Sequence, residues 1–228
     1  MLTIVSELCY NVQFFERHGR DLDDPWSCRR SAVCHKYHLK TQRFAWISVQ
    51  APRAWDRSLR DLRYSHESHP LILNLRFVRA ANTTLREYLN YMSGKLLELV
   101  VHIQDTKIST FTLRCANLNQ DQRVAFQKPL AEFDFDFTLY QEVHSLRRKL
   151  YRVERILTGT SRVLKTVARH AKVAKTVEHI TDQRHEIFEE EVNSNIGDVE
   201  GYRSTVRELL NTSEDIKSTV SVTACYNT

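Results

Sequence analysis

Hydrophobic residues from position 139 onward recur in alternating steps of four and three residues. This spacing places one apolar stripe along a helix, as in helices that pack lengthwise against a partner helix. The first stripe consists of Leu139, Val143, Leu146, Leu150, Val153, Leu157, Thr160, Leu164, Val167, Ala171 and Ala174. The second, which has one extra step of three, consists of Val192, Ile196, Val199, Tyr202, Val206, Leu209, Ser213, Ile216 and Val220. The pattern predicts two long helices.

The two predicted helices carry opposite charge. Residues 139–184 contain eleven Lys and Arg against four Asp and Glu, whereas residues 185–215 contain nine acidic residues against two Arg. Net charges of +7 and −7 on consecutive helices favour an antiparallel hairpin with complementary flanks. An intermolecular coiled coil, or a basic helix that binds phosphate, remains an alternative.

Before residue 139 the pattern is mixed and shorter. Residues 43–52 are aromatic and β-branched and end in proline, which predicts a strand. Residues 108–115 and the alternating stretch 133–137 predict two more strands. The apolar run 69–78 fits a helix or a buried strand, and residues 117–132 have the composition of a loop.

A helix is predicted to follow Thr84. The spacing Thr84-x-x-Glu87 is that of a capping box. An apolar stripe at helical spacing follows it: Leu85, Tyr88, Leu89, Met92, Leu96 and Leu99. The predicted fold class is therefore α+β and mostly helical. Residues 1–132 form a mixed α/β domain with a small mixed sheet and packed helices, and residues 133–228 form a long antiparallel helical hairpin.

Composition limits the function classes. A hydrophobic fraction of 42% and a charged fraction of 27% are typical of a globular chain. The five cysteines are an odd number at irregular spacing, which favours reduced thiols in the cytoplasm. We find no leader peptide and no apolar run of membrane-spanning length, so we expect no direct membrane span. A pI near 9.0 is compatible with polyanion binding but is weak evidence for it.

The stretch "DPWSCRRSAVCHKYH" (24–38) concentrates cysteine, histidine and arginine. Adjacent Cys34 and His35 point to different sides of a helix or a strand, and no Cys-x-x-Cys pair is present, so a zinc site is disfavoured. The same adjacency disfavours a cysteine nucleophile with His35 as its base. The structural interpretation is a helix with Pro25 in its first turn and a core face of three residues, Trp26, Val33 and Tyr37.

Four motifs follow one another in the first part of the chain: "DPWSCRRSAVCHKY", "FAWISVQAP", "HPLILNLRFV" and "LREYLNYM". Their order resembles the cytosolic region of fungal CorA-like magnesium transporter-domain proteins. The later stretch "FDFTLYQEVHSLRRKL" resembles the entry into the stalk helix of that family. The Gly-Met-Asn motif of the pore is not found, and the chain ends where the first membrane helix would begin. The resemblance thus implies the cytosolic region without the transmembrane pore.

The resulting functional expectation is a non-enzymatic CorA-like regulatory or assembly domain. It would act through helix-mediated association with itself or a CorA-like relative, without nucleic acid, and lie in the cytoplasm, peripheral to a membrane through a partner. No cofactor is expected. Divalent Mg²⁺ is the one cation that the resemblance suggests, with candidate ligands Asp134, Asp136, Glu189 and Glu190. The candidate interaction seam consists of Leu146, Leu150, Val153, Leu157, Leu164, Val206 and Leu209. The alternatives are a truncated CorA-like transporter and an accessory protein of a fungal biosynthetic pathway.

Overall fold

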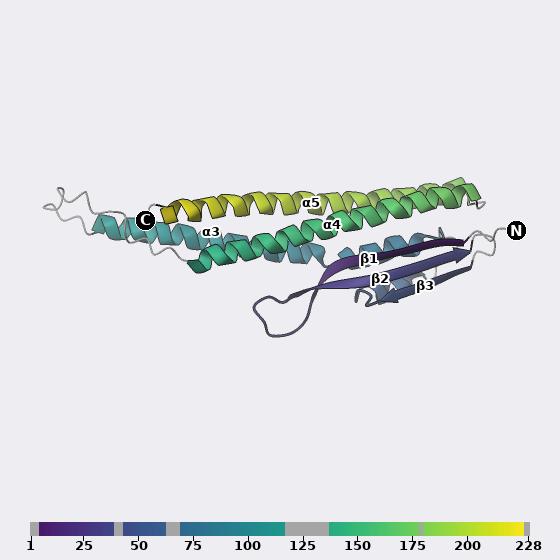
Figure 1. The fold of residues 1–228 in the computed structure, drawn as a ribbon, viewed down its shortest axis with the longest axis horizontal. Helices are drawn as coiled ribbons and strands as arrows, with labels where there is room; N and C mark the ends of the chain where they lie inside the picture. Colours follow the sequence, from purple (N-terminus) through teal and green to yellow (C-terminus); the bar gives the residue numbers. More distant parts are fainter. Residues whose placement is uncertain (1–4, 39–42, 63–68, 117–136, 178–179, 226–228) are drawn as a thin grey trace. The chain divides into compact units, whose positions relative to one another are not determined.

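The computed structural model describes residues 5–38, 43–62, 69–116, 137–177 and 180–225 (Figure 1). These residues form a three-stranded sheet followed by helices, and the chain is mostly helical, as predicted. The elements in chain order are β1 (Val5–Arg17), β2 (Trp26–His38), β3 (Arg43–Val49), α1 (Trp55–Leu62), α2 (Ile72–Asn82), α3 (Leu85–Ala116), α4 (Phe137–Val177) and α5 (Asp182–Cys225). Among the described helices, none is long and apolar enough to cross a membrane.

The sheet has the order β1-β2-β3 and is antiparallel throughout, whereas a mixed sheet was predicted. Strands β1 and β2 pair along their whole length, from Val5 opposite His38 to Arg17 opposite Trp26. Because side chains alternate along a strand, every second residue faces the core. The buried face includes Leu8, Val12, Phe14, Ser31, Val33, His35 and Tyr37.

The prediction of a helix at 24–38 is wrong, because Trp26–His38 of this stretch form β2. Trp26, Val33 and Tyr37 are buried as expected, and their spacing of seven and four residues is that of one face of a helix. The residue that distinguishes a strand from a helix is His35, which is buried between Val33 and Tyr37. Burial at 33, 35 and 37 has the period of two that only a strand produces.

The strand predicted at 43–52 is confirmed by β3, and the ambiguous run 69–78 contributes to α2. The strand predicted at 108–115 is wrong, because these residues continue α3. An established helix gains a hydrogen bond with each added residue, which outweighs the local preference of β-branched residues for strands. The loop predicted at 117–132, and the strand at 133–137 apart from Phe137, lie outside the described residues.

Helix α3 begins directly after Thr84, and its predicted apolar stripe is buried. The Thr84 hydroxyl donates a hydrogen bond to the Phe15 carbonyl of β1, which differs from the predicted capping-box contact. The Tyr88 ring stacks on Phe15, with ring centroids 4.0 Å apart. The start of α3 is therefore held by the sheet as well as by its own sequence.

The chain divides into two compact units. Unit 1 contains residues 1–88 and 154–204, and unit 2 contains residues 89–153 and 205–228. An aromatic cluster of Trp46, Trp55 and Phe77 lies in the core of unit 1. The core of unit 2 includes Met92, Leu96, Val143, Leu150 and Val153. The domain boundary predicted after residue 132 falls in a segment that the structure does not describe, and it stays a prediction.

Helices α4 and α5 run antiparallel, side by side (Figure 1). In unit 1 Lys172 pairs with Glu189 and Lys175 with Asp182, and in unit 2 Arg147 pairs with Glu214. These pairs join the basic helix to the acidic helix, as their opposite charges predicted. Of the first predicted stripe, every member except the half-buried Leu139 is buried.

Candidate functional site

Of the four acidic residues proposed from sequence as Mg²⁺ ligands, the structure describes Glu189 and Glu190. Asp134 and Asp136 lie outside the described residues. The Glu189 carboxylate lies 3.4 Å from His185 Nε2 and 4.0 Å from Lys172 Nζ, and Glu190 is exposed. A cation at Glu189 would therefore compete with the Lys172 ammonium group. The role of these residues as ligands stays a prediction.

The residues of the predicted interaction seam pack inside this chain. All are buried except Leu209, which is half-buried next to the buried Leu210. Truncating such side chains would cost stability whether or not they also meet another chain. An association that used them would first have to separate α4 from α5. Their role in association therefore stays a prediction.

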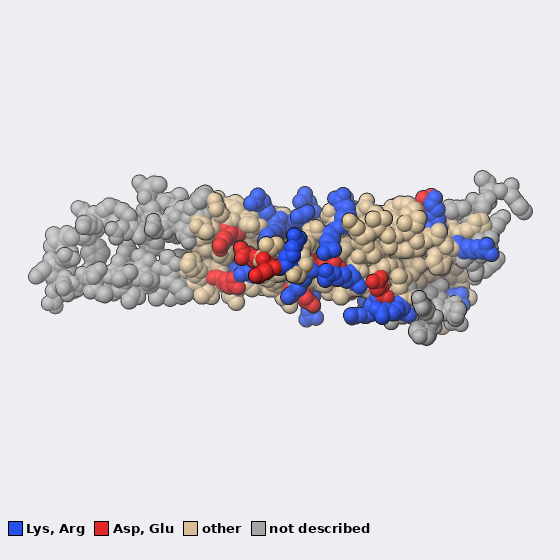
Figure 2. All heavy atoms as spheres, turned by 90° about the horizontal axis from the view of Figure 1, so that it is seen from below, with Lys and Arg blue, Asp and Glu red and all other residues tan. Residues whose placement is uncertain are grey.

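Acidic and basic side chains of the described residues are mixed on one face of the molecule. Figure 2 shows Lys and Arg interspersed with Asp and Glu on the face that it draws. Polyanion binding is favoured by a surface of one sign, where the fields of neighbouring charges add. The mixture on this face is not such a surface.

Cys34 and His35 lie on opposite faces of the sheet, as expected for neighbours in a strand. The His35 ring is only 1% exposed, and its Nδ1 lies 2.9 Å from Nδ2 of Asn74. The Asn74 amide oxygen accepts a hydrogen bond from the Tyr10 hydroxyl at 3.1 Å. Burial lowers the pKa of His35 to about 4. His35 is thus part of a buried polar network and cannot act as a base for the Cys34 thiol.

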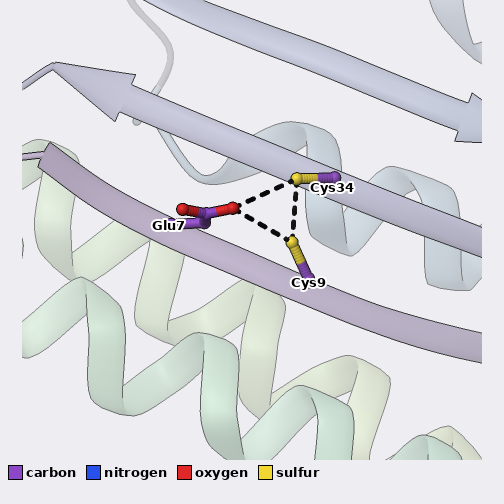
Figure 3. A group of neighbouring side chains, drawn as sticks. All are labelled: Glu7, Cys9 and Cys34. Carbon is purple, nitrogen blue, oxygen red and sulfur yellow. Dashed lines mark hydrogen bonds between the residues drawn. The ribbon is translucent and has the colours of Figure 1, made fainter.

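A cluster of three potential ligands lies on the other face, where Cys34 meets Glu7 and Cys9 of β1 (Figure 3). We call these three residues the thiol–carboxylate cluster. Cys9 and Cys34 are register partners in the sheet, and their Sγ atoms are 2.8 Å apart. Glu7 Oε1 lies 3.6 Å from the Cys9 sulfur and 3.7 Å from the Cys34 sulfur. Among the described residues, this is the one group of three metal-ligating side chains close enough to share an ion.

Electrostatics around the cluster favour the protonated form of the Cys9 thiol. Lys36, the register partner of Glu7, places Nζ 3.3 Å from Glu7 Oε1, and its hydrogen bond and charge lower the pKa of Glu7. The pKa of Cys9 is raised to about 11, first by its hydrogen bond with Cys34 and then by burial and by Glu7. A thiol that keeps its proton at neutral pH is a weak nucleophile and a weak metal ligand.

The donor set of the cluster matches a soft or borderline metal such as Zn²⁺ better than Mg²⁺, because two of its three atoms are sulfur. Two features work against a metal. Zinc–sulfur bonds of about 2.3 Å in a tetrahedron would hold the two sulfurs roughly 3.7 Å apart, so both strands would have to adjust. The Lys36 ammonium group beside Glu7 also repels a cation.

The sequence analysis missed Glu7 and Cys9 because they lie far from Cys34 in the chain. A hairpin register that pairs Cys9 with Cys34 also pairs Glu7 with Lys36, a favourable cross-strand pair. The occurrence of both pairs in one register was the signal in the sequence that could have predicted the cluster. It was lost once 24–38 was interpreted as a helix, because a helix has no cross-strand partners.

The fold and the site define a mainly helical α+β chain that carries two thiols and a carboxylate on the outer face of its sheet. A family model described as CorA-like transporters matches residues 4–99, from β1 into α3. This part of the chain is therefore similar to CorA-like transporters, in agreement with the resemblance seen in the sequence. The match covers less than half of the chain, and the fungal source and the missing pore stay predictions. No curated protein matches the chain.

Proposed function

We propose that this chain is a non-enzymatic, CorA-like regulatory or assembly module that acts by associating with a second chain of the same kind. The observation that carries the proposal is the match of residues 4–99 to CorA-like transporters. It is supported by the long helices α4 and α5, and by the finding that none of the described helices is suited to cross a membrane.

The association surface that we propose lies on α3. Leu97 and Val101 are one helical turn apart and are 63% and 47% exposed. Residues four apart share a helix face, so the two side chains form a short apolar stripe. Burying a leucine and a valine against another chain would gain about 1.5–3 kcal/mol for each side chain that is fully covered. A second copy of this chain presents the same stripe, which suits a two-fold symmetric contact.

The proposal contains no nucleic-acid partner. Three basic residues of α4, namely Arg147, Lys172 and Lys175, pair with acidic residues of α5. A basic side chain that is already paired with a carboxylate of the same chain contributes less to the attraction of a polyanion. We place the module in the cytoplasm, where a CorA-like partner would hold it next to a membrane.

Size-exclusion chromatography with light scattering on the full chain tests the association. We expect a mass above that of one chain that rises with concentration. The double variant Leu97→Glu with Val101→Glu should shift the mass toward one chain, because a charge in an apolar contact is costly to bury.

Leu22→Glu is the matched control, since Leu22 is similarly exposed at 57% but lies between β1 and β2. It should leave the mass unchanged. A single-chain mass for the unaltered protein at every concentration would contradict the proposed self-association.

A further inference from the structure

The two thiols of the thiol–carboxylate cluster occupy directly opposite positions of an antiparallel pair. Opposite residues in such a pair have Cα atoms about 4.5–5.5 Å apart, which lies within the range of about 4.4–6.8 Å found across disulfides. The sulfur atoms are 2.8 Å apart, against about 2.05 Å in a disulfide bond. A small change in side-chain torsion would bring them to bonding distance.

We propose that Cys9 and Cys34 form a reversible cross-strand disulfide by exchange with a low-molecular-weight disulfide, and that this bond clamps the edge strand β1 to β2. Cys9 is exposed and Cys34 is half-buried on the same face, so a small reactant can reach the pair. The site is independent of the stripe on α3 that we propose for association.

The reaction proceeds in two balanced exchanges. The thiolate of one cysteine attacks a sulfur of the small disulfide, so a mixed disulfide forms and one small thiol leaves with a proton. The second cysteine, as thiolate, attacks the protein sulfur of the mixed disulfide, and the second small thiol leaves. In total, two protein thiols are oxidised to one disulfide while one small disulfide is reduced to two thiols.

The surroundings favour this reaction over metal binding. A disulfide brings the sulfur atoms closer together, whereas a shared metal would require them to separate. A disulfide also carries no charge, so Lys36 does not oppose its formation. The raised pKa of Cys9 makes the exchange slow at neutral pH and faster as the pH rises, because the thiolate is the attacking species.

The experiment treats the reduced full chain with oxidised glutathione at pH 8, then blocks the remaining thiols and maps the peptides without reduction. We expect a peptide pair joined through Cys9 and Cys34, a fall from five titratable thiols to three, and a mass loss of two hydrogen atoms. A small dithiol should reverse all three changes. Because the bond closes a loop of about 25 residues, the thermal transition should rise by roughly 7–14 °C.

Three variants make the assignment specific. Cys9→Ser should retain glutathione on Cys34, because the second thiol that would displace it is missing, and Cys34→Ser should retain it on Cys9. Cys28→Ser is the control on the same strand, where the register partner is Phe15, and it should form the bond normally.

Other outcomes overturn the proposal. They are a lasting glutathione adduct on the unaltered chain, a bond that involves Cys28, a disulfide-linked dimer, or no reaction. Complete protection of both thiols by micromolar Zn²⁺ would instead assign the cluster as a metal site.

Discussion

Asn74 is the residue on which the buried polar network of unit 1 depends. Its amide nitrogen lies 2.9 Å from His35 Nδ1 and donates to the Leu71 carbonyl, while its oxygen accepts from Tyr10. Because the amide nitrogen is a donor, His35 Nδ1 must be the acceptor and carry no proton. Protonating His35 would place two donors against each other in a buried site, which is unfavourable.

A second buried imidazole lies at His69. Its ring stacks on Phe188 with centroids 3.9 Å apart, and the ring of His185 is 5.9 Å away. Burial, with a smaller contribution from His185, lowers the pKa of His69 to about 4. The folded chain therefore holds both His35 and His69 neutral at pH 7.

These two histidines predict a loss of stability in mild acid. Their pKa values are about 4 in the folded chain and near 6.5 in the unfolded chain, so the unfolded chain binds protons more readily. The stabilisation is complete above about pH 6.5 and is lost as the pH falls toward about 4. Urea unfolding at pH 7.5 and pH 5 should show a decrease on the order of 2 kcal/mol for each histidine.

His69→Asn isolates one of the two contributions, since an asparagine oxygen can still accept the hydrogen bond from the Leu71 amide. In this variant the difference in the free energy of unfolding between pH 7.5 and pH 5 should shrink by about half. His102→Asn, at an exposed position of α3, should leave it unchanged. Equal pH dependence in His69→Asn and the unaltered chain would contradict the prediction.

At the scale of elements, local sequence patterns predicted the secondary structure correctly where one apolar stripe continued over many turns. The stripe of α4 is buried almost without exception. An apolar repeat that continues over so many turns fits only a helix with one buried face. The stretch 24–38 is too short for that, and the spacing of Trp26, Val33 and Tyr37 by seven and four residues imitates one face of a helix. The pairing with β1 and β3 decides in favour of a strand, and pairing is not visible in the stretch itself.

The antiparallel register of α4 and α5 is open to a charge-exchange test. The Arg147 side chain, 12% exposed, pairs with Glu214 and donates to Ser213 Oγ at 3.1 Å. Arg147→Glu should lower the free energy of unfolding by roughly 1–3 kcal/mol, because it removes these bonds and places two carboxylates together. Adding Glu214→Arg should recover about 1 kcal/mol, measured by urea unfolding as a double-mutant cycle.

The pair Lys95 and Glu98 is the control, since both residues lie on α3 and their side chains are 41% and 66% exposed. Exchanging their charges should change the stability by less than about 0.5 kcal/mol. If Glu214→Arg does not rescue Arg147→Glu, the contact between these two helices does not form in solution as described.

At the scale of the whole molecule, the candidate ligands Glu189 and Glu190 of α5 predict a response to Mg²⁺ that is separate from the contact proposed on α3. A cation shared between chains binds the assembled form more tightly than the single chain, and so favours assembly. Millimolar Mg²⁺ should therefore raise the mass measured by light scattering. Glu189→Gln with Glu190→Gln should weaken the effect, because it removes the carboxylates that the cation would prefer.

Asp215→Asn is the control for this experiment, since it removes an exposed carboxylate from the same helix at a distant position. A mass that does not change with Mg²⁺, or a response that survives in the double variant, would contradict the proposed role of Glu189 and Glu190. The competing Lys172 ammonium group leads us to expect only weak affinity.

The amino-acid sequence by itself determined the helical class, the two oppositely charged long helices, the stripe of α3 and strand β3. Each of these depends on a periodicity or a charge pattern that lies within one continuous segment of the chain. Only the tertiary structure decided that Trp26–His38 is a strand, that 108–115 is helical, and that Glu7 and Cys9 meet Cys34. The first and third of these features depend on pairing between segments far apart in the chain, where the energy of contact outweighs local preference, and the second depends on the continuation of an established helix.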